Sequence, residues 1–95
     1  MTITRYNQAQ DVEELIRVYG GRPARRRGLY YCPFHEDEHA SLSVYTWRGQ
    51  RYCRCFSAHS DCPLAEHSWN DAFNVYCIGE GIDAKEALRR LNRPS

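Results

Sequence analysis

The feature that most constrains this chain is a thiol and an imidazole two residues apart. Cys32 and His35 flank Pro33 and Phe34. This spacing lets both side chains hold one metal ion from a single tight turn, and Pro33 pre-sets φ for that turn. More cysteines follow about twenty residues further on, a distance that suits a hairpin returning to close a tetrahedron. We therefore predict one structural Zn²⁺, with Cys32 and His35 as its first two ligands.

The other two ligands are less constrained by spacing. Cys53 and Cys55 compete for the third position, because only one residue separates them. Cys62 is predicted as the fourth ligand, with His59 and His67 as alternatives on the same loop. Thiolate ligands quench the Lewis acidity that catalytic zinc uses, so a structural site is favoured over a catalytic one.

Length and cysteine count point to one small domain in a reducing compartment. Ninety-five residues make a single domain, residues 1–95, with a modest core that a metal would staple. Five cysteines is an odd number, which favours metal binding over a full set of disulfides. The sequence starts without an apolar leader and has no apolar run long enough to span a membrane, so we expect a cytoplasmic protein without membrane contact.

Hydrophobic periodicity predicts a small α+β fold. Residues 11–19 and 83–91 carry apolar side chains at helical spacing behind Asp-x-x-Glu capping signals, and a further helix is predicted over residues 70–78, with Cys77 buried on its apolar face. Residues 29–31, 41–45 and 50–55 are predicted strands, and residues 22–28 a loop or an edge strand. We expect a zinc ribbon with about three antiparallel strands, one helix before the sheet and two after it, and a loose arm over residues 1–10.

Arginine and aromatic residues gather around the predicted hairpin. Between residues 22 and 54 there are seven arginines against three acidic residues, although the net charge of the whole chain is only +1. Aromatic rings stack on bases and arginines hold phosphates, so the pattern suits a single-strand binding platform. The alternative is an ordinary solvated hairpin with aromatic cross-strand pairs. The predicted nucleic-acid-binding residues are Arg25, Arg26, Arg27, Trp47, Arg48, Arg51, Tyr52 and Arg54.

Several segments, in order, resemble the zinc-binding domain of bacterial and phage replicative primases. The resemblance runs from about residue 11 to residue 91. Its most specific parts are the Cys-Pro-Phe-His motif at 32–35 with the basic strand before it, the strand Ser41-Leu42-Ser43-Val44, and the run Glu80-Gly81-Ile82-Asp83-Ala84-Lys85-Glu86-Ala87-Leu88. The resemblance implies a zinc-binding domain, bacterial or phage-encoded, that helps recognise single-stranded DNA template and assists a separate primase or polymerase.

The chain departs from the family pattern at the second ligand pair. The family has a tight Cys-Phe-Gly-Cys, whereas Cys55-Phe56 is followed by a cysteine only at position 62. The match to Cys-Phe favours Cys55 as the third ligand over Cys53, so the expected set is Cys32, His35, Cys55 and Cys62. The acidic motifs of a primase polymerase domain are missing, so we expect no catalytic activity from this chain.

Two other functions fit the same residues. One is a small phage or mobile-element protein that binds and regulates a host protein of replication or transcription, such as primase or RNA polymerase. The other, ranked last, is an enzyme or redox sensor using Cys53 or Cys55 as a reactive thiol. The sequence makes no prediction of oligomeric state.

Overall fold

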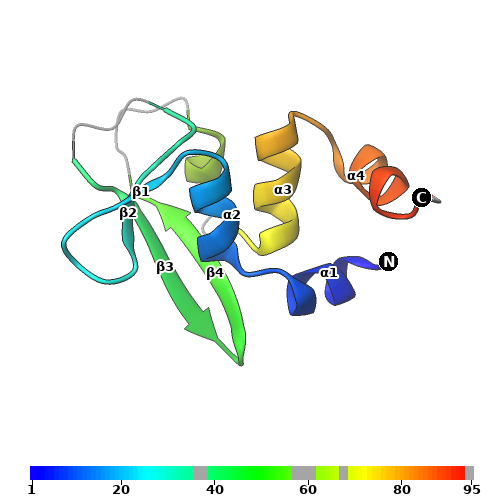
Figure 1. Ribbon diagram of the computed structural model, residues 1–95, viewed down its shortest axis with the longest axis horizontal. Coiled ribbons are helices and arrows are strands. Elements are labelled where there is room, and N and C mark those ends of the chain that lie inside the picture. Colours follow the sequence, from blue (N-terminus) through cyan, green and yellow to red (C-terminus); the bar gives the residue numbers. More distant parts are fainter. Residues whose placement is uncertain (36–38, 57–61, 67–68, 94–95) are drawn as a thin grey trace.

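A computed structural model describes residues 1–35, 39–56, 62–66 and 69–93 of the chain (Figure 1). Two helices precede the strands and three follow them, in the order α1 (Ile3–Ala9), α2 (Val12–Val18), β1 (Arg22–Pro23), β2 (Leu29–Tyr31), β3 (Leu42–Trp47), β4 (Gln50–Cys55), the 3₁₀ helix η1 (Pro63–Glu66), α3 (Ala72–Glu80) and α4 (Ala84–Leu91). The predicted α+β class with an antiparallel sheet is confirmed. The described residues contain one strand and one leading helix more than predicted.

The sheet has four strands instead of three, in the order β1-β2-β3-β4, and every neighbouring pair is antiparallel. The additional strand is β1, which comes from the basic connector and pairs Arg22 with Tyr31. Pro23 lies in this strand at the edge of the sheet, where a missing N–H breaks no ladder hydrogen bond.

Residues 1–10, expected as a loose arm, contain the helix α1. The Thr2 side chain caps it by accepting a hydrogen bond from the backbone N–H of Arg5 at 3.2 Å. The buried ring of Tyr6 then packs edge-on against Phe73 of α3, with ring centroids 5.9 Å apart. One buried aromatic residue leaves no periodic pattern in the sequence, which is why the helix was not predicted.

The other three helices agree with the sequence patterns to within two residues at each end. Asp11 and Asp83 cap α2 and α4, accepting hydrogen bonds from the backbone N–H groups of Glu13 and Glu86. α2 packs against β4 on one face of the sheet, and α3 lies alongside α2 and contacts η1 (Figure 1). Their fully buried side chains, among them Ile16 and Val75, meet Leu42 of β3 and Leu64 of η1 in a single core.

The predicted role of Cys77 is confirmed, because its side chain is buried in this core. Among the described helices, none has the length and apolar character needed to cross a membrane.

Candidate metal centre

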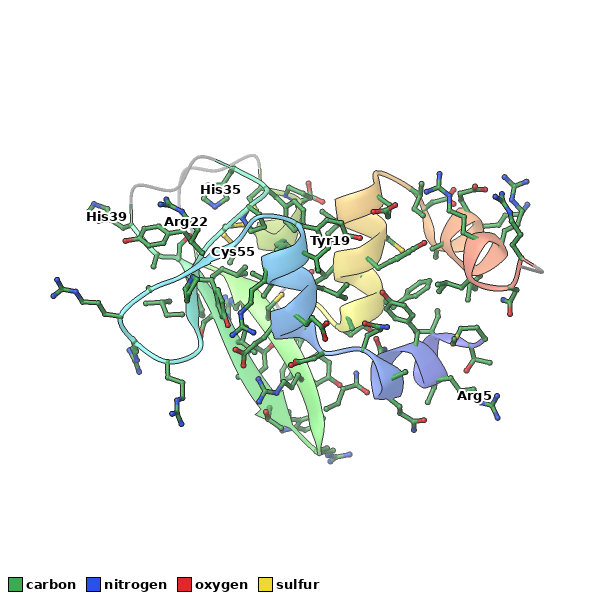
Figure 2. All side chains as sticks on the ribbon, viewed as in Figure 1. Arg5, Tyr19, Arg22, His35, His39 and Cys55 are labelled. Carbon is green, nitrogen blue, oxygen red and sulfur yellow. The ribbon has the colours of Figure 1, made fainter. Side chains whose placement is uncertain are left out.

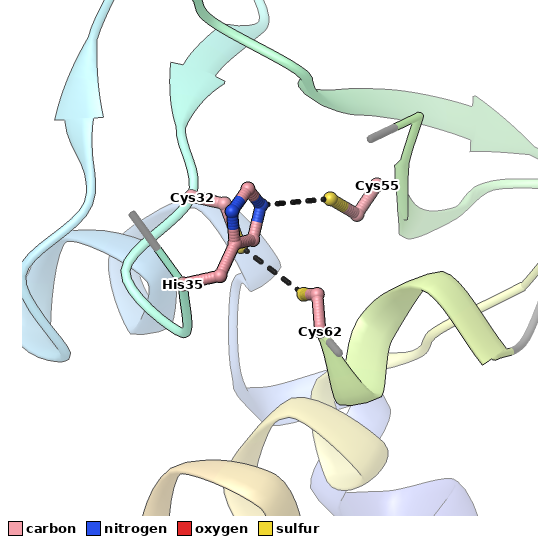
Figure 3. Close-up of side chains that lie close together, drawn as sticks. All are labelled: Cys32, His35, Cys55 and Cys62. Carbon is pink, nitrogen blue, oxygen red and sulfur yellow. Dashed lines mark hydrogen bonds between the residues drawn. The ribbon is translucent and has the colours of Figure 1, made fainter. Parts of the chain in front are cut away.

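The topology of the sheet brings the predicted ligands together. β2 and β4 both run antiparallel to β3, so these two strands run in the same direction and their C-terminal ends lie on the same side of the sheet. Cys32 follows directly after β2, and Cys55 is the last residue of β4. Cys62 stands directly before η1, so its side chain reaches the same place from a third segment (Figure 3).

The four side chains form a compact cluster of ligand atoms. One ligand atom from each of Cys32, His35, Cys55 and Cys62 lies within 4.8 Å of all the others. The sulfurs of Cys32 and Cys62 are 3.6 Å apart, and His35 Nε2 is 3.3 Å from the sulfur of Cys55 (Figure 3). Tetrahedral Zn²⁺ with ordinary bond lengths separates two sulfurs by about 3.8 Å, and a sulfur from a nitrogen by about 3.6 Å. The cluster therefore fits one tetrahedral metal ion.

Burial determines the protonation of these thiols when no metal is bound. All three cysteines are buried, and His35 is half-buried. Removal from solvent raises the pKa of the Cys32 thiol well above its usual value and also raises the pKa of Cys62. These two thiols are therefore protonated at physiological pH when no metal is bound, and a divalent ion must displace their protons in order to bind.

Cys53 lies outside the cluster. Alternation along β4 puts Cys53 and Cys55 on the same face of the sheet, where they pair with Val44 and Leu42 respectively. Cys53 is two residues further from the strand end, fully buried, and its backbone bridges to Asn70. Desolvation in this position raises the pKa of the Cys53 thiol to about 12.

Of the three histidines besides His35, the structure describes one. His59 and His67 lie outside the described residues. His39 is exposed and is not part of the cluster found among the described residues (Figure 2).

Four aromatic side chains gather on the face of the sheet that points away from α2. Tyr45 of β3 stacks on Tyr52 of β4, and Trp47 lies on the same face. Trp69 contacts all three rings, with centroid distances of 5.4 to 5.6 Å. Trp47 and Trp69 remain 48% and 53% exposed. We call Tyr45, Trp47, Tyr52 and Trp69 the aromatic face.

Trp69 was not among the predicted binding residues. Its neighbour Asn70 bridges to Cys53 with backbone hydrogen bonds of 2.9 and 3.1 Å, so residues 69 and 70 run alongside β4. Asn70 then points into the core and Trp69 to the opposite side. No local pattern in the sequence predicts this pairing between Asn70 and Cys53.

The eight predicted nucleic-acid-binding residues divide between two sides of the sheet. Trp47 and Tyr52 belong to the aromatic face; Arg48 lies over the ring of Trp47 at 4.3 Å, and Arg54 over Phe56 at 4.7 Å. Arg51 is on the other side, where it forms ion pairs with Glu13 and Asp11. Arg25, Arg26 and Arg27 are exposed on the loop between β1 and β2.

Comparison of the chain with protein-family models, curated protein sequences and solved structures finds no match.

Proposed function

We propose that this chain is a zinc-stabilised, non-catalytic module that binds single-stranded DNA, as its resemblance to primase zinc-binding domains implies, and that it assists a separate primase or polymerase. The observation that carries the proposal is the aromatic face with its two half-exposed tryptophans. Bases of any sequence stack on such rings, with about 1–3 kcal/mol per stacked base.

Arginines beside the rings supply the electrostatic part of the proposal. Arg48, in the turn before β4, and Arg54, near the end of β4, lie over aromatic rings, so their guanidinium groups are held near positions where bases would stack. A guanidinium group matches the geometry of a phosphate and holds it with two hydrogen bonds. A strand stacked on the aromatic face would thus meet positive charge along its backbone.

The metal centre has a supporting role in this proposal. Cys32, His35, Cys55 and Cys62 would hold one Zn²⁺, which ties the ends of β2 and β4 to η1 and so keeps the sheet in shape. All four positions around the ion would be filled by protein, which leaves none for a substrate. Burial also raises the pKa values of Cys53 and Cys77, which opposes a reactive thiolate at either residue.

The test is titration of the zinc-loaded chain with single- and double-stranded oligonucleotides of equal length at two salt concentrations. Trp69→Ala should weaken single-strand binding by about tenfold or more, the loss of one stacked base. Val18→Ala, at an exposed apolar position on α2, is the matched control and should change affinity less than twofold. Affinity that does not fall with salt, or that survives Trp69→Ala, contradicts the proposal.

A second candidate function is binding to a replication or transcription protein. The observation in its favour is a hollow of about 570 Å³ that includes Tyr52 and Trp69 of the aromatic face. Apolar side chains extend its lining beyond that face: Ile3, Phe73, Ile78 and Ile82. Purified primase and RNA polymerase are the partners to assay directly. Ile82→Glu should abolish binding to such a partner while leaving oligonucleotide affinity unchanged. If the unmodified chain and the Ile82→Glu variant bind the partner equally well, this function is contradicted.

A further inference from the structure

A second groove opens on the side of the sheet opposite the aromatic face. It lies between the loop joining β1 and β2, the helix α2 and the strand β4, and its volume is about 470 Å³. Five arginines contribute to its lining: Arg17, Arg25, Arg26, Arg27 and Arg51. Glu13 is the acidic residue among the described residues that line it. We call this feature the arginine groove.

Glu13 forms ion pairs with two of these arginines, Arg17 and Arg51. Its carboxylate accepts a 2.5 Å hydrogen bond from the hydroxyl of Tyr30 and forms ion pairs with Arg51 and, at 3.7 Å, with Arg17. Arg17 also donates a 2.9 Å hydrogen bond to the Tyr30 hydroxyl. Glu13 therefore positions two guanidinium groups along one wall of the groove, and Asp11, 3.9 Å from Arg51, supplies a second negative charge for them.

The other three arginines have no such role in the fold. Arg25, Arg26 and Arg27 are exposed, and none of them forms an ion pair with another described residue. The loop itself is held by its backbone, since Ala24 N–H donates to the carbonyl of Leu29 and Val44 N–H donates to that of Gly28. The side chains are thus presented from an anchored loop.

The arginines in the groove outnumber the acidic residues that contact them. Five arginines against Glu13 and Asp11, which pairs with Arg51, leave an excess of three positive charges in a chain whose net charge is +1. Like charges that line one groove repel one another. A multiply charged anion relieves this repulsion, and the planar guanidinium fork is suited to phosphate oxygens in particular.

We propose that the arginine groove is a phosphate-binding site separate from the aromatic face. Its ligand carries several adjacent phosphate charges, either the polyphosphate of a free nucleotide or consecutive phosphates of a nucleic-acid backbone. The proposal depends on the lining of the groove and stands whether or not bases stack on Trp69.

The test compares two variants that each lose three positive charges. Arg25, Arg26 and Arg27 are all changed to Gln in the first, and Arg5, Arg89 and Arg93 in the second, which removes exposed arginines elsewhere on the molecule. Calorimetric titration of the zinc-loaded chain with inorganic tripolyphosphate should show at least tenfold weaker binding for the first variant. The second should bind within about twofold of the unmodified chain.

If both variants bind tripolyphosphate equally weakly, its binding depends only on net charge, and the proposal is overturned. The proposal is also overturned if the unmodified chain does not bind tripolyphosphate. Amide shifts on tripolyphosphate addition provide an independent readout, since they should centre on Glu13 and Gly28. Shifts confined to the aromatic face also contradict it.

A second titration with a single-stranded oligonucleotide separates the two sources of phosphate. If the first variant also loses oligonucleotide affinity, the groove binds a nucleic-acid backbone; if only tripolyphosphate binding falls, it binds a free polyphosphate. Trp69→Ala should leave tripolyphosphate binding intact. The groove and the aromatic face can therefore fail or succeed independently.

Discussion

Two buried cysteines two positions apart on β4 illustrate how finely single residues are placed. Cys55 contributes a sulfur to the cluster of metal-ligand atoms, whereas Cys53 packs in the core beside Asn70. Both point to the same face of the sheet, so alternation along the strand does not distinguish them. Their distance from the strand end does, because only the last residue of β4 reaches the segments that carry the other three ligands.

The first prediction concerns this pair. Cys55→Ala should lose most of the bound zinc in the presence of a competing chelator, because three ligands hold the ion less tightly than four. Cys53→Ala should keep one zinc per chain and lose only about 1 kcal/mol of stability through the small cavity it leaves. Zinc content after gel filtration distinguishes them. Zinc lost from Cys53→Ala and retained by Cys55→Ala would reverse the assignment of the third ligand.

The second prediction concerns alkaline pH and Tyr6. Burial, with smaller contributions from Tyr76, Cys77 and Glu80, raises the pKa of Tyr6 from 10.0 to about 12. Because the folded-state pKa is the higher one, this residue contributes its stability fully below pH 10 and loses it between pH 10 and 12. Tyr6→Phe keeps the packing against Phe73 but cannot ionise.

Chemical denaturation at pH 9 and pH 11 checks this. The stability of Tyr6→Phe should fall less over that interval than the stability of the unmodified chain, and Tyr31→Phe serves as the control for a tyrosine outside the core. Identical pH dependence in all three proteins argues against a buried, titrating Tyr6.

At the scale of whole elements, the contact between α2 and α3 depends on a glycine. A Cβ atom on Gly79 would lie 2.4 Å from the ring of Tyr19, which packs next to it. That ring also contacts Phe34, between Cys32 and His35, with centroids 6.0 Å apart. The close approach of the two helices is thereby linked to the turn that carries the first two ligands.

The third prediction follows from that contact. Alanine in place of a helical glycine normally stabilises by about 1 kcal/mol, but Gly79→Ala should destabilise the chain by about 1–3 kcal/mol because Tyr19 must move. In a Tyr19→Ala background the same change should become stabilising. Thermal denaturation of the four proteins measures the coupling, and a stabilised Gly79→Ala single variant would show that the ring moves away without cost.

A second element-scale feature is Asn70, which ties the segment after η1 to the sheet. The side chain is fully buried and donates to the carbonyls of Cys53 at 3.1 Å and Leu64 at 2.9 Å. It also accepts a hydrogen bond from Asn74 in α3. One side chain thus joins β4, η1 and α3.

The fourth prediction is that Asn70→Ala destabilises the chain by about 2–4 kcal/mol, because two buried carbonyls lose a donor. Urea denaturation measures it. Asn92→Ala, at an exposed asparagine that also donates to a backbone carbonyl, is the control and should cost less than about 1 kcal/mol. Equal losses in both would indicate that the Asn70 network is solvated.

For the whole molecule, the metal centre is part of the core. Cys32, Cys55 and Cys62 belong to the same buried cluster as Ile16, Leu42 and Leu64. The chain is small, and a structural zinc ion is typically worth about 10–16 kcal/mol. We therefore expect metal and fold to be lost together.

The fifth prediction tests this coupling. A strong zinc chelator should abolish the near-ultraviolet circular dichroism of the aromatic residues and make the chain sensitive to protease, and added Zn²⁺ should restore both. Chelator already saturated with zinc is the control. An unchanged spectrum after complete zinc removal would show that the hydrophobic core is sufficient, and would leave the metal a local role.

Much of the local structure could be predicted from residue order. Caps and 3.6-residue spacing predicted three helices, alternation predicted the β3–β4 hairpin, and the Cys-x-x-His turn predicted the first half of the metal site. These features depend on residues a few positions apart, whose relative geometry the backbone itself restricts.

Packing between distant segments decided the rest. It made a helix of residues 3–9 through one buried tyrosine and brought Trp69 onto the aromatic face. It also separated Arg51 and the loop arginines from Arg48 and Arg54 by the thickness of the sheet. None of these outcomes follows from spacing along the chain, because each depends on which elements meet, and that is determined by burying one common core.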